Sequence, residues 1–164
     1  MEVETPGIIT IKNCYNTGNI IYTGTGYGAP NGGIIGNVGS DATVNIANCY
    51  NSGDVTGQNV ASGIAGSVSN TTIIVNCYNT GNITGPSISG GILGSANTSS
   101  VVNITSCYNS GNITTVSSAP AGGISSAYGT ITNSHNTGNI TSASTSLAGE
   151  IIGYGTCRNR LYIP

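Results

Sequence analysis

The chain has 164 residues and few charges: three Lys or Arg against five Asp or Glu give a formal net charge of -2. Its 26 glycines and its abundance of Asn, Ser and Thr are poor material for a conventional globular core. The basic residues Lys12, Arg158 and Arg160 lie at opposite ends of the sequence, which argues against nucleic acid as a partner because phosphate binding needs clustered positive charge.

An octapeptide recurs along the chain, and its copies are 13–20 (NCYNTGNI), 48–55 (NCYNSGDV), 76–83 (NCYNTGNI), 106–113 (SCYNSGNI) and 133–140 (NSHNTGNI). Its second residue stands at positions 14, 49, 77, 107 and 134, so the period is 35, 28, 30 and 27 residues. A second motif, Gly-Ile-x-Gly, alternates with the octapeptide at 33–36, 63–66 and 91–94, and in weaker form at 123–126 and 150–153. Periods of this length are typical of stacked supersecondary units.

Each period contains three short β-branched segments in chain order: an apolar patch before the octapeptide, the octapeptide itself and the Gly-Ile-x-Gly motif. Such segments, separated by Gly, Asn and Ser, predict three strands and three corners. The sequence therefore predicts an all-β, right-handed parallel β-helix, or β-solenoid, of about five coils of 27–35 residues. We expect residues 1–164 to form one domain, with 154–164 as a terminal cap or joining segment.

The first residue of the octapeptide is expected to be a bend. Strict alternation would place Cys14 opposite Ile9 and Ile11, so a bend is needed if all three are to face inward. We therefore predict bends at Asn13, Asn48, Asn76, Ser106 and Asn133.

The four repeat cysteines then form an inward ladder of small apolar side chains at Cys14, Cys49, Cys77 and Cys107. Ser134 in the fifth copy fits the same small slot. The absence of CxxC pairs argues against zinc, and no metal or other cofactor is expected. Whether the thiols are free or paired stays open.

The rest of the octapeptide is a turn signal. We predict that its glycines adopt positive φ, at Gly18, Gly53, Gly81, Gly111 and Gly138. Stacking identical turns predicts a ladder of side-chain amides at Asn16, Asn51, Asn79, Asn109 and Asn136.

An outward aromatic stripe follows each Cys position and consists of Tyr15, Tyr50, Tyr78, Tyr108 and His135. Such a stripe can bind sugars or a partner surface, but stacked aromatic rings also stabilise a parallel sheet. Both interpretations stay open here. His135 has no Cys or carboxylate near it in sequence and is expected to be a substituted tyrosine. Sequons occur at Asn70, Asn82, Asn97, Asn103, Asn112 and Asn139, and their occupancy is open.

The pairing of Gly-Ile-x-Gly with a downstream Asn-Cys-Tyr-x-Thr-Gly-Asn-Ile resembles the GLUG motif, a short repeat of bacterial surface and secreted proteins. The resemblance covers about Ile8 to Gly153. It implies an extracellular or cell-surface location and an adhesin-like role, although the start of this chain lacks the pattern of a signal peptide. Some relatives in that family are IgA-cleaving metallopeptidases, but no HExxH motif is present in this chain.

The leading functional hypothesis is a noncatalytic extracellular stalk or adhesin segment, or a fibre subunit that assembles end to end. The sequence shows no capping helix and no charged terminal strand, so we expect the chain itself, stacked head to tail, as the main partner. Cell-surface glycans bound by the aromatic stripe are the alternative, and no membrane span is expected. A polysaccharide-active enzyme is a remote alternative, because its five acidic residues (Glu2, Glu4, Asp41, Asp54 and Glu150) do not cluster.

Overall fold

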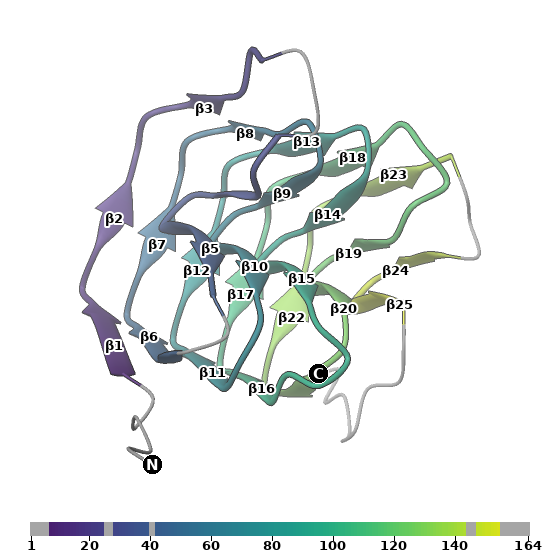
Figure 1. The fold of residues 1–164 in the computed structure, drawn as a ribbon. Coiled ribbons are helices and arrows are strands. Elements are labelled where there is room, and N and C mark those ends of the chain that lie inside the picture. Colours follow the sequence, from purple (N-terminus) through teal and green to yellow (C-terminus); the bar gives the residue numbers. More distant parts are fainter. Residues whose placement is uncertain (1–6, 25–27, 40–41, 144–146, 155–164) are drawn as a thin grey trace.

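The computed structural model describes residues 7–24, 28–39, 42–143 and 147–154. These residues form a parallel β-solenoid in which the chain passes five times around a common axis (Figure 1). Every strand pair is parallel, and each strand of the three middle coils pairs with the equivalent strands of the coils before and after it. The predicted fold class is therefore confirmed.

Three of the five sheets are formed by the apolar patch and the octapeptide. Sheet A contains β1 (Gly7–Lys12), β6 (Ala42–Ala47), β11 (Thr72–Val75), β16 (Val102–Thr105) and β21 (Thr130–Thr132). Sheet B contains β2 (Tyr15–Asn16), β7 (Tyr50–Asn51), β12 (Tyr78–Asn79), β17 (Tyr108–Asn109) and β22 (His135–Asn136). Sheet C contains β3 (Ile20–Ile21), β8 (Val55–Thr56), β13 (Ile83–Gly85), β18 (Ile113–Thr115) and β23 (Ile140–Ser142).

The other two sheets close each coil around the Gly-Ile-x-Gly motif. Sheet D contains β4 (Asn31–Gly32), β9 (Val60–Ser62), β14 (Ile88–Gly90), β19 (Ala121–Gly122) and β24 (Ala148–Gly149). Sheet E contains β5 (Ile35–Val38), β10 (Ala65–Val68), β15 (Leu93–Ala96), β20 (Ser125–Ala127) and β25 (Ile152–Tyr154).

The coil thus has five short strands where the sequence predicts three. Two of the three predicted segments are each divided by a corner: the octapeptide supplies strands to sheets B and C, and the Gly-Ile-x-Gly region supplies strands to sheets D and E. Inside the octapeptide the corner is the predicted turn, whereas the corner between sheets D and E has only two residues, such as 33–34, and leaves no separate signal in the sequence pattern. It is nevertheless enough to end one strand and begin another in a different direction.

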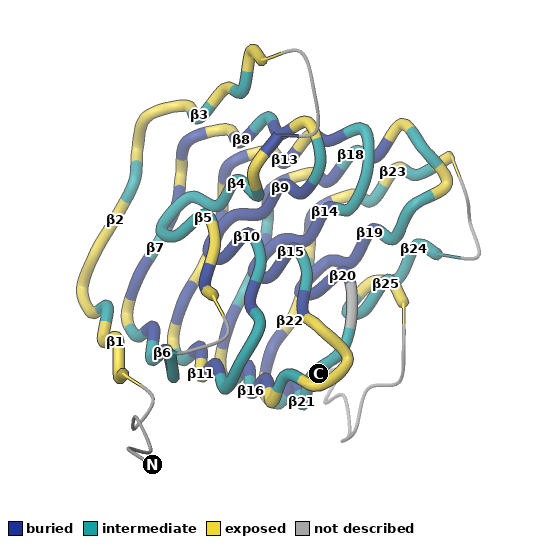
Figure 2. Tube along the Cα trace, viewed as in Figure 1, coloured by how far each residue is buried: buried dark blue, intermediate teal, exposed yellow. Residues whose placement is uncertain are grey.

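The interior contains two apolar columns. The larger lies between sheets A and E and holds side chains such as Val44, Ile46 and Leu93, together with the buried cysteines. The smaller lies between sheets C and D and contains Val55, Ala61, Ile83, Ile113 and Ala121. Buried residues are concentrated in the three middle coils, whereas the residues of the first and last coils are mostly exposed or intermediate (Figure 2). Each coil therefore obtains its core by covering its neighbours, as expected for a solenoid.

Candidate functional site

The predicted bends lie at the first residue of each octapeptide. Each of these residues has a left-handed backbone with φ between 48° and 56°, and they are Asn13, Asn48, Asn76, Ser106 and Asn133. Asparagine tolerates this conformation better than most residues with a side chain. The bend turns the next side chain inward, so Cys49, Cys77 and Cys107 are buried in the larger column.

The cysteine column is made of free thiols. Cys14, Cys49, Cys77 and Cys107 are all unpaired, and Cys14 is exposed because the first coil has no neighbour on its outer side. Burial raises the pKa of the Cys49 thiol, and a hydrogen bond to Cys107 together with burial raises the pKa of Cys77. Ser134 occupies the same slot and accepts a hydrogen bond from the Cys107 backbone N–H at 3.0 Å. Cys157 lies outside the described residues. The column is suited to packing rather than to thiolate chemistry.

The octapeptide asparagines form the predicted ladder along the axis of the solenoid. Each Nδ2 donates to the Oδ1 of the asparagine in the next coil at 2.7 Å, in the pairs Asn16–Asn51, Asn51–Asn79, Asn79–Asn109 and Asn109–Asn136. Each Nδ2 also donates to the carbonyl oxygen two residues later, for example Asn51 to Gly53 at 2.7 Å. Asn51, Asn79 and Asn109 are fully buried, so the ladder satisfies amides that would otherwise be costly to bury.

The glycines of the octapeptide are not in the predicted conformation. Among the described glycines only Gly129 has positive φ, so the prediction for Gly18, Gly53, Gly81, Gly111 and Gly138 was wrong. The reason for glycine is close approach instead. A Cβ on Gly53, Gly81, Gly111 or Gly138 would overlap the carbonyl oxygen of the equivalent glycine in the preceding coil. Within the part of the chain that the structure describes, no coil precedes Gly18, and the atom nearest to a Cβ there would be Asn16 Oδ1, at 3.9 Å.

The first glycine of the Gly-Ile-x-Gly motif lies against the amide ladder. A Cβ on Gly33 would lie 2.6 Å from the side-chain carbon of Asn51, and one on Gly91 would lie 2.5 Å from that of Asn109. The asparagine side chains therefore reach across the coil to this glycine column. They separate the two apolar columns, and a polar ladder that is fully hydrogen-bonded can be placed there at little cost.

A second ladder, which sequence reasoning missed, follows the last polar position of the octapeptide. A side-chain oxygen in one coil accepts from a backbone N–H of the next coil, in the pairs Asn19–Asp54, Asp54–Asn82, Asn82–Asn112 and Asn112–Asn139, at 2.8–3.1 Å. The alignment of Asn or Asp at this position in all five copies was the available signal. Asp54 is thus an acceptor in a structural column, and three of the six sequon asparagines take part in the same column.

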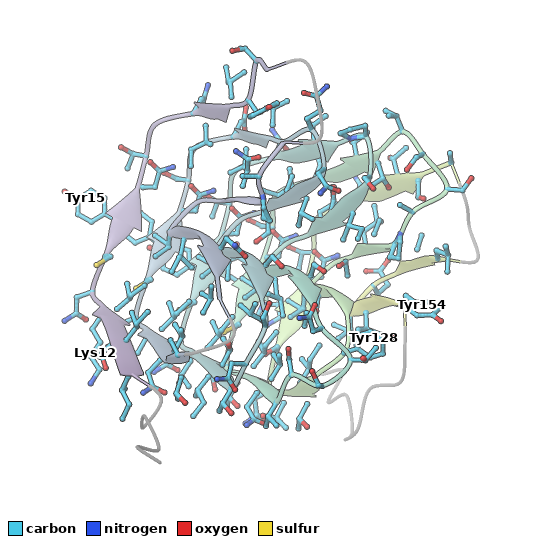
Figure 3. All side chains as sticks on the ribbon, in the orientation of Figure 1. Lys12, Tyr15, Tyr128 and Tyr154 are labelled. Atoms are coloured by element: carbon cyan, nitrogen blue, oxygen red, sulfur yellow. The ribbon has the colours of Figure 1, made fainter. Side chains whose placement is uncertain are left out.

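The aromatic stripe is stacked along sheet B. Ring centroids of Tyr15 and Tyr50 lie 5.3 Å apart and those of Tyr50 and Tyr78 lie 4.9 Å apart, with interplanar angles of 9° and 3°. Tyr78–Tyr108 and Tyr108–His135 are tilted, at 6.3 Å and 4.9 Å. Stacked rings cover each other's faces, whereas a sugar ring stacks on a free aromatic face. Tyr15, at the N-terminal end of the stacked part, points outward from the first coil and is 67% exposed (Figure 3), whereas Tyr78, at the other end of the stacked part, is 40% exposed.

The two ends of the stack differ. At the N-terminal end, β1, β2 and β3 have a neighbour on one side only, and Ile8, Tyr15 and Ile21 are exposed. At the other end, the exposed carboxylate of Glu150 accepts a hydrogen bond from Asn136 Nδ2 at 3.2 Å. The sequence-based expectation of two uncapped ends missed this contact. The signal was present, because Glu150 replaces the first glycine of the fifth Gly-Ile-x-Gly motif.

Other site chemistry is limited in the part of the chain that the structure describes. That part contains no group of three or more His, Cys, Asp or Glu placed to hold a metal ion. No helix within it is long and apolar enough to span a bilayer. Glu2, Glu4 and Asp41 lie outside the described residues, as does the segment predicted as a cap at 154–164 except for Tyr154.

Comparison with known proteins supports the fold. The structure is similar to the crystal structure of a Bacteroides ovatus protein described as a putative immunoglobulin A1 protease, with a TM-score of 0.67 and 22% sequence identity. The similarity covers 87% of this chain and 48% of that protein, so the chain spans about half of its length. At this identity the likeness shows the β-solenoid fold alone. No protein-family model and no curated protein sequence matches the chain, so the resemblance to GLUG repeats stays a prediction.

Proposed function

We propose that the chain is a noncatalytic structural module of a secreted or cell-surface protein, acting as a stalk or adhesin segment. The observation that carries this proposal is the amide ladder. In every octapeptide copy the asparagine at this position hydrogen-bonds to the asparagine of an adjacent coil and so holds the two coils together. The aromatic stripe and the second ladder do the same on the outer surface. Side chains that could otherwise contact a substrate are used to keep the coils in register.

The charge distribution favours the same proposal. From Val55 to Gly149 the sequence has no Asp, Glu, Lys or Arg, so the long sides of the solenoid are almost uncharged. Of the acidic residues that the structure describes, Asp54 and Glu150 each accept hydrogen bonds within a ladder. A polysaccharide-cleaving site needs carboxylates that converge on a substrate, and the two lie in different ladders at different levels of the stack.

A panel of uncharged and acidic polysaccharides tests the absence of catalysis. We expect no release of reducing ends after prolonged incubation with the purified chain. Release that disappears in an Asp54→Asn variant would overturn the proposal. An antibody against the chain, applied to intact cells of its source, tests the location. We expect surface labelling, and an exclusively internal pool would contradict an extracellular stalk.

Glycan binding by the aromatic stripe is a weaker second candidate. It is favoured by the exposed outer face of Tyr15 and disfavoured by the mutual stacking of the rings behind it. A single ring face at one end would give a small binding site, not an extended one. A glycan array probed with wild type and Tyr15→Ala decides: binding that is lost in the variant supports this candidate.

Association with other copies through the ends is the second form in which a structural module could act. The N-terminal end supports it, because among the described residues no strand pairs with the outer side of β1, β2 or β3. The other end of the stack determines whether such association can continue into a fibre.

A further inference from the structure

Glu150 takes the position of the next coil's asparagine at the end of the amide ladder. Inside the stack, each asparagine donates to the Oδ1 of the next asparagine at 2.7 Å. For the last asparagine, Asn136, a carboxylate oxygen of Glu150 accepts at 3.2 Å in place of that Oδ1. The acceptor comes from the same coil, since the two residues are 14 positions apart.

The residue at this position decides whether another coil can follow. In the four preceding coils it is Gly33, Gly63, Gly91 or Gly123. A Cβ on any of them would overlap a backbone carbonyl oxygen of the next coil and crowd the next asparagine. Every coil that is followed by another coil therefore has glycine here, and the last described coil has glutamate. A side chain at this position cannot coexist with a further coil in the same register.

The N-terminal end has the complementary geometry. Gly18 and Asn16 present the same groups that Gly53 and Asn51 present to the coil before them, but no coil of the described residues lies on their outer side. The first coil of a second copy is thus the natural occupant of the C-terminal end, because that contact would repeat the interface already formed four times within the chain. In that contact, Glu150 of one copy would meet Asn16 of the other.

We propose that Glu150 terminates the stack by blocking the docking of a second copy's N-terminal end onto the C-terminal end of the solenoid. The proposal rests on the structural role proposed above and states what prevents head-to-tail association at the C-terminal end. It does not depend on whether the chain lacks catalytic activity, so the polysaccharide panel and the association experiment can fail separately.

The test compares three variants at this position and a blocking variant at the other end. Glu150→Gly restores the glycine of the four preceding coils, and Glu150→Ala removes the carboxylate but keeps a Cβ that still obstructs the next coil. Gly18→Ala is the blocking variant at the other end. Its Cβ is tolerated within one molecule, but it would collide with the backbone of a docked copy, just as a Cβ on Gly53 would overlap the carbonyl oxygen of Gly18 within the chain. Glu150→Gln keeps the length of the side chain and removes its charge.

Sedimentation velocity and negative-stain microscopy over a concentration series give the readout. We expect Glu150→Gly to self-associate at a concentration at least tenfold lower than wild type, and to form end-to-end particles. Glu150→Ala and Glu150→Gln should behave as wild type, and Gly18→Ala should reverse the gain in the double variant. Equal association of folded Glu150→Gly and Glu150→Ala would overturn the proposal, as would association of wild type as strong as that of Glu150→Gly.

A second measurement does not depend on the folding of the glycine variant. In wild type, the NMR signals of the Asn136 side-chain amide should differ from those in Glu150→Ala, because the carboxylate is its acceptor. Asn136 amide signals that are the same in both proteins would show that Glu150 does not cap the ladder in solution, and the proposal would fail.

Discussion

Removal of one buried rung of the amide ladder should destabilise the whole stack. Asn79 is fully buried and makes three side-chain hydrogen bonds: it accepts from Asn51 at 2.7 Å, and it donates to Asn109 at 2.7 Å and to the Gly81 carbonyl at 2.8 Å. Asn79→Ala leaves those three partners buried without it. Each unsatisfied buried group costs about 1–3 kcal/mol, so with partial relaxation we expect a loss of roughly 3–6 kcal/mol. That is a large share of the 5–15 kcal/mol that stabilises a typical domain.

The matched control is Asn16→Ala at the open end of the same ladder. Asn16 donates to Asn51 and to Gly18, but it is half-buried, and water can replace it. Its loss should cost about 1 kcal/mol.

Urea unfolding followed by tyrosine fluorescence and circular dichroism measures the difference, since the chain has nine Tyr and no Trp. At about 2–4 °C per kcal/mol, Asn79→Ala should lower Tm by roughly 6–24 °C. If the two alanine variants lose the same stability within about 0.5 kcal/mol, the buried ladder is not what holds the coils together, and the reasoning above is refuted.

Three further predictions test other columns of the stack. Gly81→Ala should destabilise the protein strongly, because its Cβ would overlap a backbone carbonyl of the preceding coil. Gly18→Ala should change Tm by less than about 2 °C. Equal effects of the two substitutions in thermal melts would contradict the close-approach argument. In the folded protein the pKa values of the Cys49 and Cys77 thiols are raised above 9.0. Their contribution to stability should therefore be complete below about pH 8.5 and decrease as the pH rises toward 10. Urea unfolding at a series of pH values should show this decrease in the free energy of unfolding, and alanine at both positions should make the decrease smaller. Tyr78→Ala should lower the free energy of unfolding by about 1–2 kcal/mol, because the ring packs on its neighbours. An unchanged Tm combined with a loss of glycan binding would instead identify the stripe as a binding surface.

The repeat by itself determines much of the architecture. An octapeptide that returns every 27 to 35 residues has to stack on its own copies, because one coil is too thin to bury its apolar side chains. The phase conflict between Ile11 and Cys14 was enough to place a bend at Asn13 and its equivalents, and the left-handed backbone lies at those residues. The same repetition predicted that Asn51, Asn79 and Asn109 would lie above one another.

The tertiary structure decided how closely the coils approach, and this changed the meaning of several residues. A sequence cannot distinguish a glycine that adopts positive φ from one that leaves room for a neighbour, and Gly53 proved to be the second kind. Five strands rather than three arose because short corners divide the predicted segments. Glu150 acquired its role only when Asn136 was found beside it: in the sequence it is one weak copy of a motif, whereas in the stack its carboxylate lies where the next coil would begin. The sequence pattern shows which residues repeat. Packing between coils brings together residues that are far apart in the chain, and it alone decides which side chains each repeated position can hold.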